Sequence, residues 1–135
     1  MDLMHLFFSY HGRIRRKHYW LGGLMLLGCV FVLALAIVGI AFAATDSTAV
    51  IPLLAALILA LYVFEMYVGL AISVKRAHDR DRSGWFVLAA LIPVAGPIWI
   101  LIELGLTDGT PGPNRFGPSP KGLGDPIVPV AVAAQ

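Results

Sequence analysis

The residues best suited to chemistry lie in one short segment, Lys75–Trp85, which reads KRAHDRDRSGW. Its arginines carry guanidinium groups that bind phosphate or carboxylate with paired hydrogen bonds. His78, beside Asp79, adds a group that titrates near neutral pH. Two interpretations stay open. The segment is either a turn whose charges fix membrane topology, or a binding site for a lipid headgroup, a phosphorylated metabolite or an acidic partner.

A second basic segment, Arg13–Lys17, stands directly before Tyr19 and Trp20. Tyr and Trp favour the membrane interface, and nearby cations meet anionic headgroups there. We therefore predict that both segments supply ligand or headgroup contacts. The candidates are Arg13, Arg15, Arg16, Lys75, Arg76, His78, Asp79 and Arg82.

Patterns typical of catalysis and of cofactor binding are missing from the sequence. It has no nucleophile elbow, phosphate loop or dinucleotide fingerprint, and its carboxylates are scattered. His11, His18 and His78 lack the tight ligand spacing of recognisable zinc sites. We predict no catalytic residue, no cofactor and no metal.

The composition is that of a membrane protein. Hydrophobic residues make up 59% and charged residues 13% of the chain, whereas soluble domains have about 45–50% and about 25%. Eight of the ten Lys and Arg residues lie in the two basic segments, next to apolar runs. This position argues against nucleic-acid binding. By the positive-inside rule, it predicts a cytoplasmic N-terminus and a cytoplasmic loop at 75–84. The single cysteine, Cys29, allows no disulfide within one chain.

Three apolar runs predict an all-α, multi-pass integral membrane protein. The expected spans are about 19–44, 50–74 and 85–106, and a run of about 20 apolar residues is enough to cross the bilayer. The polar turn Thr45–Thr48 carries no cation and suits the outer face. Ser83 is a candidate N-cap for the third run.

The third run is interrupted by Pro93, Gly96 and Pro97. Proline removes a helix hydrogen bond and clashes with the preceding turn. The sequence therefore predicts a third transmembrane helix that is kinked or broken there. The alternative is two spans plus a re-entrant helical hairpin, which is tolerated only where other helices shield it. The first arrangement puts the C-terminus outside, and the second returns it to the cytoplasm.

Glu65 is an acid near the middle of the second apolar run. Ionisable groups at that depth are costly and mark functional sites. A neutral structural glutamic acid, or one paired with another subunit, is preferred here over a proton relay.

The two ends of the chain differ in character. Residues 1–18 form a cytoplasmic segment whose apolar side chains suit either an interfacial helix or a partly ordered terminus. Residues 107–135 form a tail rich in Gly and Pro, without helical periodicity.

Four motifs occur in order across residues 6–121, and together they resemble the small bacterial inner-membrane proteins of domain of unknown function 805. The motifs are Gly12–Trp20, Lys75–Asp79 with Arg82–Trp85, Ile92–Gly96 and Gly109–Pro120. The resemblance implies a bacterial integral membrane protein of unknown activity and supplies no catalytic residue. A site shared by the loop and tail motifs would need the hairpin and would bring Arg115 near His78 and Asp79, which makes Arg115 a further candidate contact.

The expected function is that of a non-catalytic inner-membrane protein. It would act as an accessory or structural subunit whose basic segments contact anionic lipids, and its partners would be lipids and other membrane subunits or further copies of itself. The alternative is a small transport or ligand-binding component that uses Glu65 and the loop cluster. An enzyme ranks third.

Overall fold

A computed structural model describes residues 3–43 and 50–122 of the chain. These residues form helices, turns and one isolated bridge between Asn114 and Gly117, with no strand among them. The elements are the α-helices α1 (Leu3–Phe8), α2 (Arg16–Ala43), α3 (Val50–Asp79) and α4 (Ala95–Ile100), the 3₁₀-helix η1 (Gly84–Leu91) and the π-helix η2 (Leu101–Leu106). The predicted turn at Thr45–Thr48 and the tail beyond Gly122 lie outside the described residues.

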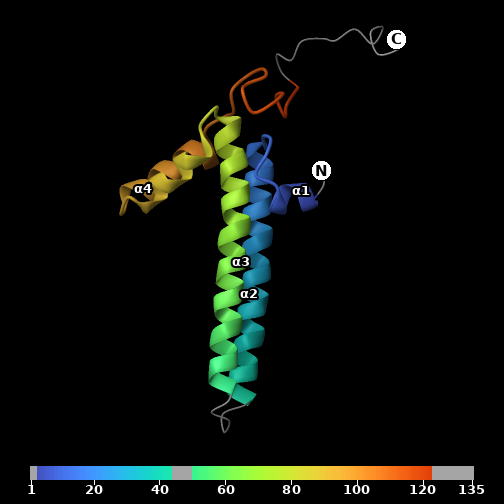
Figure 1. The fold of residues 1–135 in the computed structure, drawn as a ribbon, viewed down its shortest axis with the longest axis vertical. Helices are drawn as coiled ribbons and strands as arrows, with labels where there is room; N and C mark the ends of the chain where they lie inside the picture. Colours follow the sequence, from blue (N-terminus) through green and yellow to red (C-terminus); the bar gives the residue numbers. More distant parts are fainter. Residues whose placement is uncertain (1–2, 44–49, 123–135) are drawn as a thin grey trace, which may run out of the picture.

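The fold is built on two long antiparallel helices, α2 and α3, which lie side by side (Figure 1). They have 28 and 30 residues, so they are about 42 and about 45 Å long at 1.5 Å per residue. Both are long and apolar enough to cross a bilayer. The first two predicted spans are thus present as helices. Because α3 continues to Asp79, the first half of the segment predicted as a loop is helical instead.

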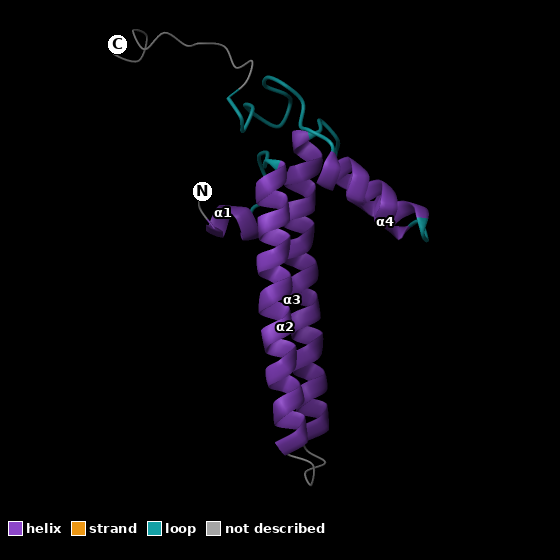
Figure 2. Cartoon of the chain, turned by 180° about the vertical axis from the view of Figure 1, so that it is seen from behind, coloured by secondary structure: helices purple, strands orange, loops and turns teal. Residues whose placement is uncertain are grey.

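The third apolar run folds back on itself. Its two arms, η1 and the α4–η2 segment, pack against each other and leave the α2–α3 pair at an angle (Figures 1 and 2). The chain reverses after Pro93 through Val94, which has a positive φ of 63°. Gly96 lies so close to the Ala89 carbonyl that a side chain on it would collide. A third span over 85–106 is therefore not confirmed, and the described backbone has the hairpin form of the alternative prediction.

Both arms of this hairpin are anchored at the same end of the α2–α3 pair. The first arm, η1, packs against α3, and at its start Ser83 accepts a hydrogen bond from the Trp85 N–H at 3.4 Å, as its predicted capping role requires. At the other arm, the Trp20 indole donates to the Gly105 carbonyl at 3.0 Å. Pro93 explains the reversal, because it lacks an N–H and disfavours a helical residue before it, whereas Pro97 lies in the first turn of α4, where no N–H is needed.

The N-terminal segment packs across the helix pair. Leu6 of α1 joins Ile14, Val68 and Ile72 in a small buried core. Residues 3–8 are therefore helical, and part of their apolar side faces the protein. Residues 107–122 then pass over the end of the pair, beside the start of α2 and the end of α3 (Figure 1).

Candidate functional site

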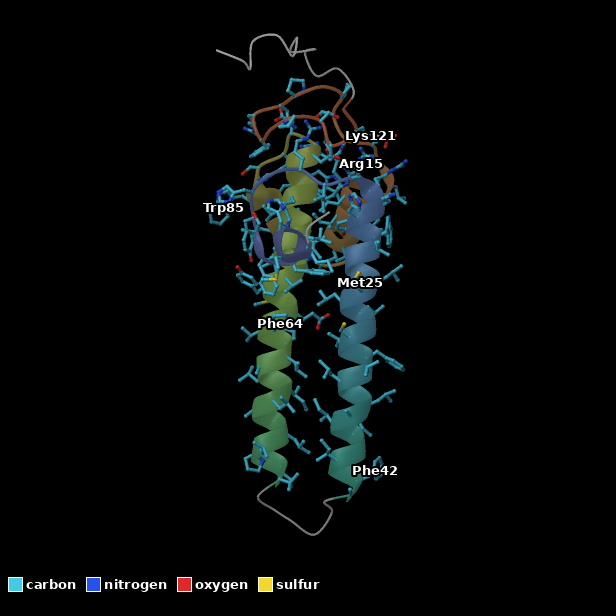
Figure 3. All side chains as sticks on the ribbon, turned by 90° about the vertical axis from the view of Figure 1, so that its right-hand side faces the viewer. Arg15, Met25, Phe42, Phe64, Trp85 and Lys121 are labelled. Carbon is cyan, nitrogen blue, oxygen red and sulfur yellow. The ribbon has the colours of Figure 1, made fainter. Side chains whose placement is uncertain are left out.

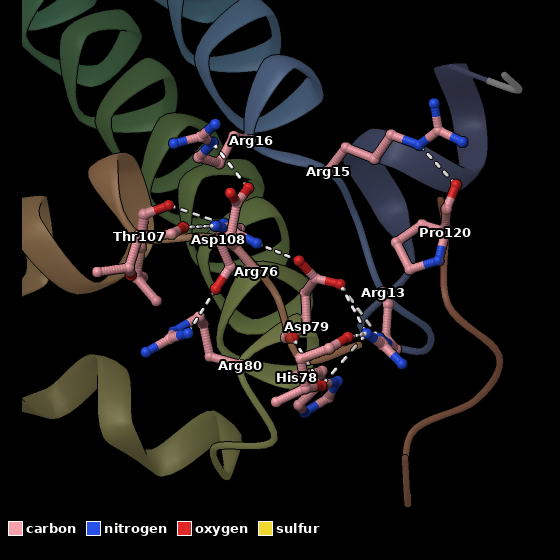
Figure 4. A network of polar contacts seen from close by, with 12 residues as sticks. Arg13, Arg15, Arg16, Arg76, His78, Asp79, Arg80, Thr107, Asp108 and Pro120 are labelled. Carbon is pink, nitrogen blue, oxygen red and sulfur yellow. Dashed lines mark hydrogen bonds and ion pairs between the residues drawn. The ribbon is translucent and has the colours of Figure 1, made fainter. Parts of the chain in front are cut away.

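A buried ion-pair network joins three charged side chains at the end of α3 (Figure 4). Asp79 accepts hydrogen bonds from Arg13 at 3.1 Å and from Arg76. The side chains of Arg13, Arg76 and Asp79 are 1%, 0% and 4% exposed. One carboxylate thus bridges two guanidinium groups away from water. We call these three residues the buried network.

The two arginines of the buried network also bind backbone carbonyls of distant segments. Arg13 donates to Thr110 and Gly112, each at 2.8 Å, and to Gly117 at 3.2 Å. Arg76 donates to Leu104 at 2.7 Å and to Thr107. Buried charges stabilise a fold only when their donors and acceptors are satisfied, and this condition is met here. The network therefore ties the N-terminal segment, α3, η2 and the tail into one unit.

Lys75 has a related role for α1. Its side chain is fully buried, and its amine donates to the carbonyls of His5, at 2.6 Å, and Leu6. Cations stabilise the carbonyl-rich end of a helix. Lys75 thus fastens the last turn of α1 to α3.

The tail motif reaches the end of α3, as the hairpin alternative requires. The Phe116 ring stacks on His78 with the ring centroids 3.8 Å apart and the planes 5° from parallel. Asn114 donates to the His78 carbonyl at 2.9 Å, and Arg115 pairs with Asp81 at 3.3 Å. The two sequence motifs therefore meet, and Arg115 lies beside the charged segment.

Glu103 is a further contact residue that the sequence interpretation missed. It lies in η2, is 9% exposed, and pairs with Arg80 at 3.2 Å and Arg82 at 3.3 Å. These pairs hold the second hairpin arm against the start of the first. One sequence feature could have indicated this contact. Glu103 is an acid near the end of the third apolar run, and that run begins just after Arg80 and Arg82.

Four exposed or partly exposed cations form a second feature, which we call the cationic rim. It consists of Arg15, Arg16, Lys17 and Lys121, and Figure 3 shows Arg15 and Lys121 close together at the start of α2. With Trp20, Gly105 and Leu106, these residues line an open cavity of about 610 Å³. Four cations thus surround one open space.

Asp108 is the acid beside the cationic rim. It pairs with Arg16 at 3.3 Å and with Lys121 at 2.9 Å. The hydrogen bond from Lys121, together with the nearby charge of Arg16, holds the pKa of Asp108 below its usual value. The carboxylate therefore stays ionised at neutral pH and offsets one of the four positive charges of the rim.

The predicted contacts divide into two groups by exposure. Arg13, Lys75, Arg76 and Asp79 are buried and bonded within the chain. The remaining candidates are at least partly accessible: Arg15, Arg16, His78, Arg82 and Arg115. Any headgroup or ligand would first meet the second group.

Glu65 stands apart from all these groups. It is half-buried on the face of α3 that also carries Val68, Ile72 and Lys75, at helical spacing. Its carboxylate has no hydrogen-bond or ion-pair partner among residues 3–43 and 50–122. These residues also contain no group of three side chains able to hold a metal ion.

Two apolar helices long enough to span a membrane, with charged side chains gathered at one end of the pair, are features of a small helical integral membrane protein. The chain belongs to the family described as "Protein of unknown function (DUF805)", whose pattern matches residues 7–118. It is 34% identical over 113 residues to "Inner membrane protein YhaH" of Escherichia coli (strain K12), covering 84% of this chain and 88% of that protein.

A second relative from the same organism, "Inner membrane protein YhaI", is 30% identical over 124 residues, covering 90% of this chain and 93% of that protein. No solved structure matches the chain. Family membership and the two long helices support a location in the bacterial inner membrane. Neither the family nor these relatives carries the name of an enzyme.

Proposed function

We propose that the protein is a non-catalytic inner-membrane protein that acts as an accessory or structural subunit and contacts anionic lipids through its basic segments. The observation that carries this proposal is the separation of the charges. The buried network is saturated by the chain itself, whereas the cationic rim lies exposed beside Trp20 at the start of α2. An accessible cluster of cations next to an interfacial aromatic residue suits phospholipid headgroups.

The orientation follows from where the cations gather. All ten Lys and Arg residues lie in 13–17, 75–82 and the tail, at Arg115 and Lys121. Contacts join these segments at one end of the α2–α3 pair. The positive-inside rule assigns this end, with the N-terminus, to the cytoplasm.

In this orientation the hairpin enters only the cytoplasmic leaflet. The first arm, η1, has eight residues, so it is about 16 Å long at the 3₁₀ rise of 2.0 Å per residue. This is about half of the 30 Å hydrocarbon core. Near the tip, Leu91 and Val94 are 77% and 78% exposed, which acyl chains would cover at little cost.

Support for an accessory role comes from Glu65, on a helix pair whose faces are open to a neighbouring helix. Only Gly22 and Ile37 of α2 are buried within the chain, and Glu65 presents a carboxylate for which the described residues supply no partner. An ionisable side chain at that depth is stabilised by pairing within a bundle. A neighbouring subunit or a second copy would supply such a partner.

Extraction of the intact protein into polymer-bounded native-membrane discs tests the proposal. We expect discs that contain more than one polypeptide and that are enriched in anionic phospholipid relative to the whole membrane. Replacing Arg15, Arg16 and Lys17 together by Gln should remove that enrichment, because each cation near the surface contributes about 1 kcal/mol. Asp81→Asn, which changes an exposed charge away from the rim, is the control. Discs with one copy alone would contradict the accessory role, and unchanged lipid composition would contradict the headgroup contacts.

A further inference from the structure

An apolar groove runs between α2 and α3, on the membrane side of the cationic rim. Its volume is about 280 Å³, and its walls include Leu24, Leu27 and Ile72. Gly23 and Gly69 also line it, and a Cβ atom added to either would meet no atom within 4 Å. The missing side chains therefore leave the groove open along both helices.

The groove and the rim cavity share one wall. Trp20 lines both spaces, and its indole is held by the 3.0 Å hydrogen bond to the Gly105 carbonyl. A cavity lined by four cations thus opens beside an apolar groove that points toward the bilayer interior. Cationic and apolar surfaces in this order match the order of groups in a phospholipid, from phosphate to acyl chain.

We propose that these two spaces form one binding site for a single anionic phospholipid of the cytoplasmic leaflet. The phosphate lies among Arg15, Arg16, Lys17 and Lys121, and one acyl chain lies in the groove past Gly23 and Gly69. Arginine binds phosphate through paired, charge-assisted hydrogen bonds, and basic pockets between transmembrane helices suit phospholipid headgroups. Four cations against the single carboxylate of Asp108 favour an anionic over a zwitterionic headgroup.

This inference rests on the proposed lipid contact and adds a defined site to it. The test is native mass spectrometry of the full-length protein in detergent micelles, after incubation with phosphatidylglycerol or, separately, phosphatidylcholine of the same chains. We expect one phosphatidylglycerol molecule to stay bound, with an affinity about tenfold above that of phosphatidylcholine. Lys121→Gln should weaken the binding about fivefold, the effect of one cation near the headgroup.

Filling the groove should also weaken the binding. The double variant Gly23→Leu and Gly69→Leu should lose the bound lipid, and Gly28→Leu, at another open glycine of α2 outside the groove, should keep it. Equal retention of the two lipids, or retention by the double variant, would overturn the site. A dimer that the double variant abolishes would assign the groove to a second copy. If native discs remain enriched in anionic lipid while no single molecule is retained, this site is wrong and the proposed function stands.

Discussion

Replacing Asp79 by Asn should lower the free energy of unfolding by about 3–5 kcal/mol, the usual effect of removing one partner from a buried ion pair. Asp79 is the carboxylate between Arg13 and Arg76, and all three side chains are almost completely buried. The amide would remove the negative charge and leave two guanidinium groups facing each other without it. A denaturant titration of the purified protein in mixed micelles measures this loss.

Asp81→Asn is the matched control for this experiment. Asp81 is two residues away and pairs with Arg115, but the two side chains are 49% and 60% exposed. Exposed pairs of this kind contribute at most about 1 kcal/mol. Equal losses of unfolding free energy for the two variants would show that the buried network does not hold the N-terminal segment, α3, η2 and the tail together.

Gly96→Ala should destabilise the hairpin by about 1–3 kcal/mol, as overpacking of a close contact does. The new Cβ would collide with the Ala89 carbonyl oxygen, which belongs to the opposite arm. The arms would have to separate. This would loosen the perpendicular packing of the Phe86 and Trp99 rings, whose centroids lie 5.6 Å apart. The thermal unfolding midpoint in detergent should fall.

Gly39→Ala is the control for the hairpin variant. Gly39 lies in α2 with open space around its Cβ position, and alanine favours a helix over glycine by up to about 1 kcal/mol. The thermal unfolding midpoint of the Gly39→Ala protein should therefore stay the same or rise. A Gly96→Ala protein as stable as the Gly39→Ala protein would mean that the arms are not packed as described.

The sequence was sufficient to predict the two long helices and the clustering of charge. Their apolar runs are continuous, and the cations stand at the ends of those runs, so length and composition decide the outcome. The shape of residues 85–106 was not decidable in this way. A kinked span and a hairpin have the same composition, and the difference lies in tertiary contacts such as that of Gly96 with Ala89 and that of Trp20 with Gly105.

The sequence also could not separate buried from accessible cations. Arg13 and Arg15 are two residues apart, yet the first is enclosed by tail carbonyls while the second lines the open cavity. The tail decides this difference, since Gly109 allows it to pass directly against the Asp79 carboxylate, where any side chain would overlap. From the sequence alone, a glycine in a tail rich in Gly and Pro does not indicate such a contact.

We propose that the chain crosses the membrane twice and that the end of the α2–α3 pair that carries Arg13, Asp79 and residues 107–122 faces the cytoplasm. Cysteine labelling with a membrane-impermeant maleimide tests it, in a Cys29→Ser background. Single cysteines are placed at the exposed positions Ala43, Asp81 and Arg115. The cysteine at 43 should react in intact spheroplasts, whereas those at 81 and 115 should react only after lysis. Labelling at 115 but not at 81 from outside would show a third crossing and exclude the two-span topology.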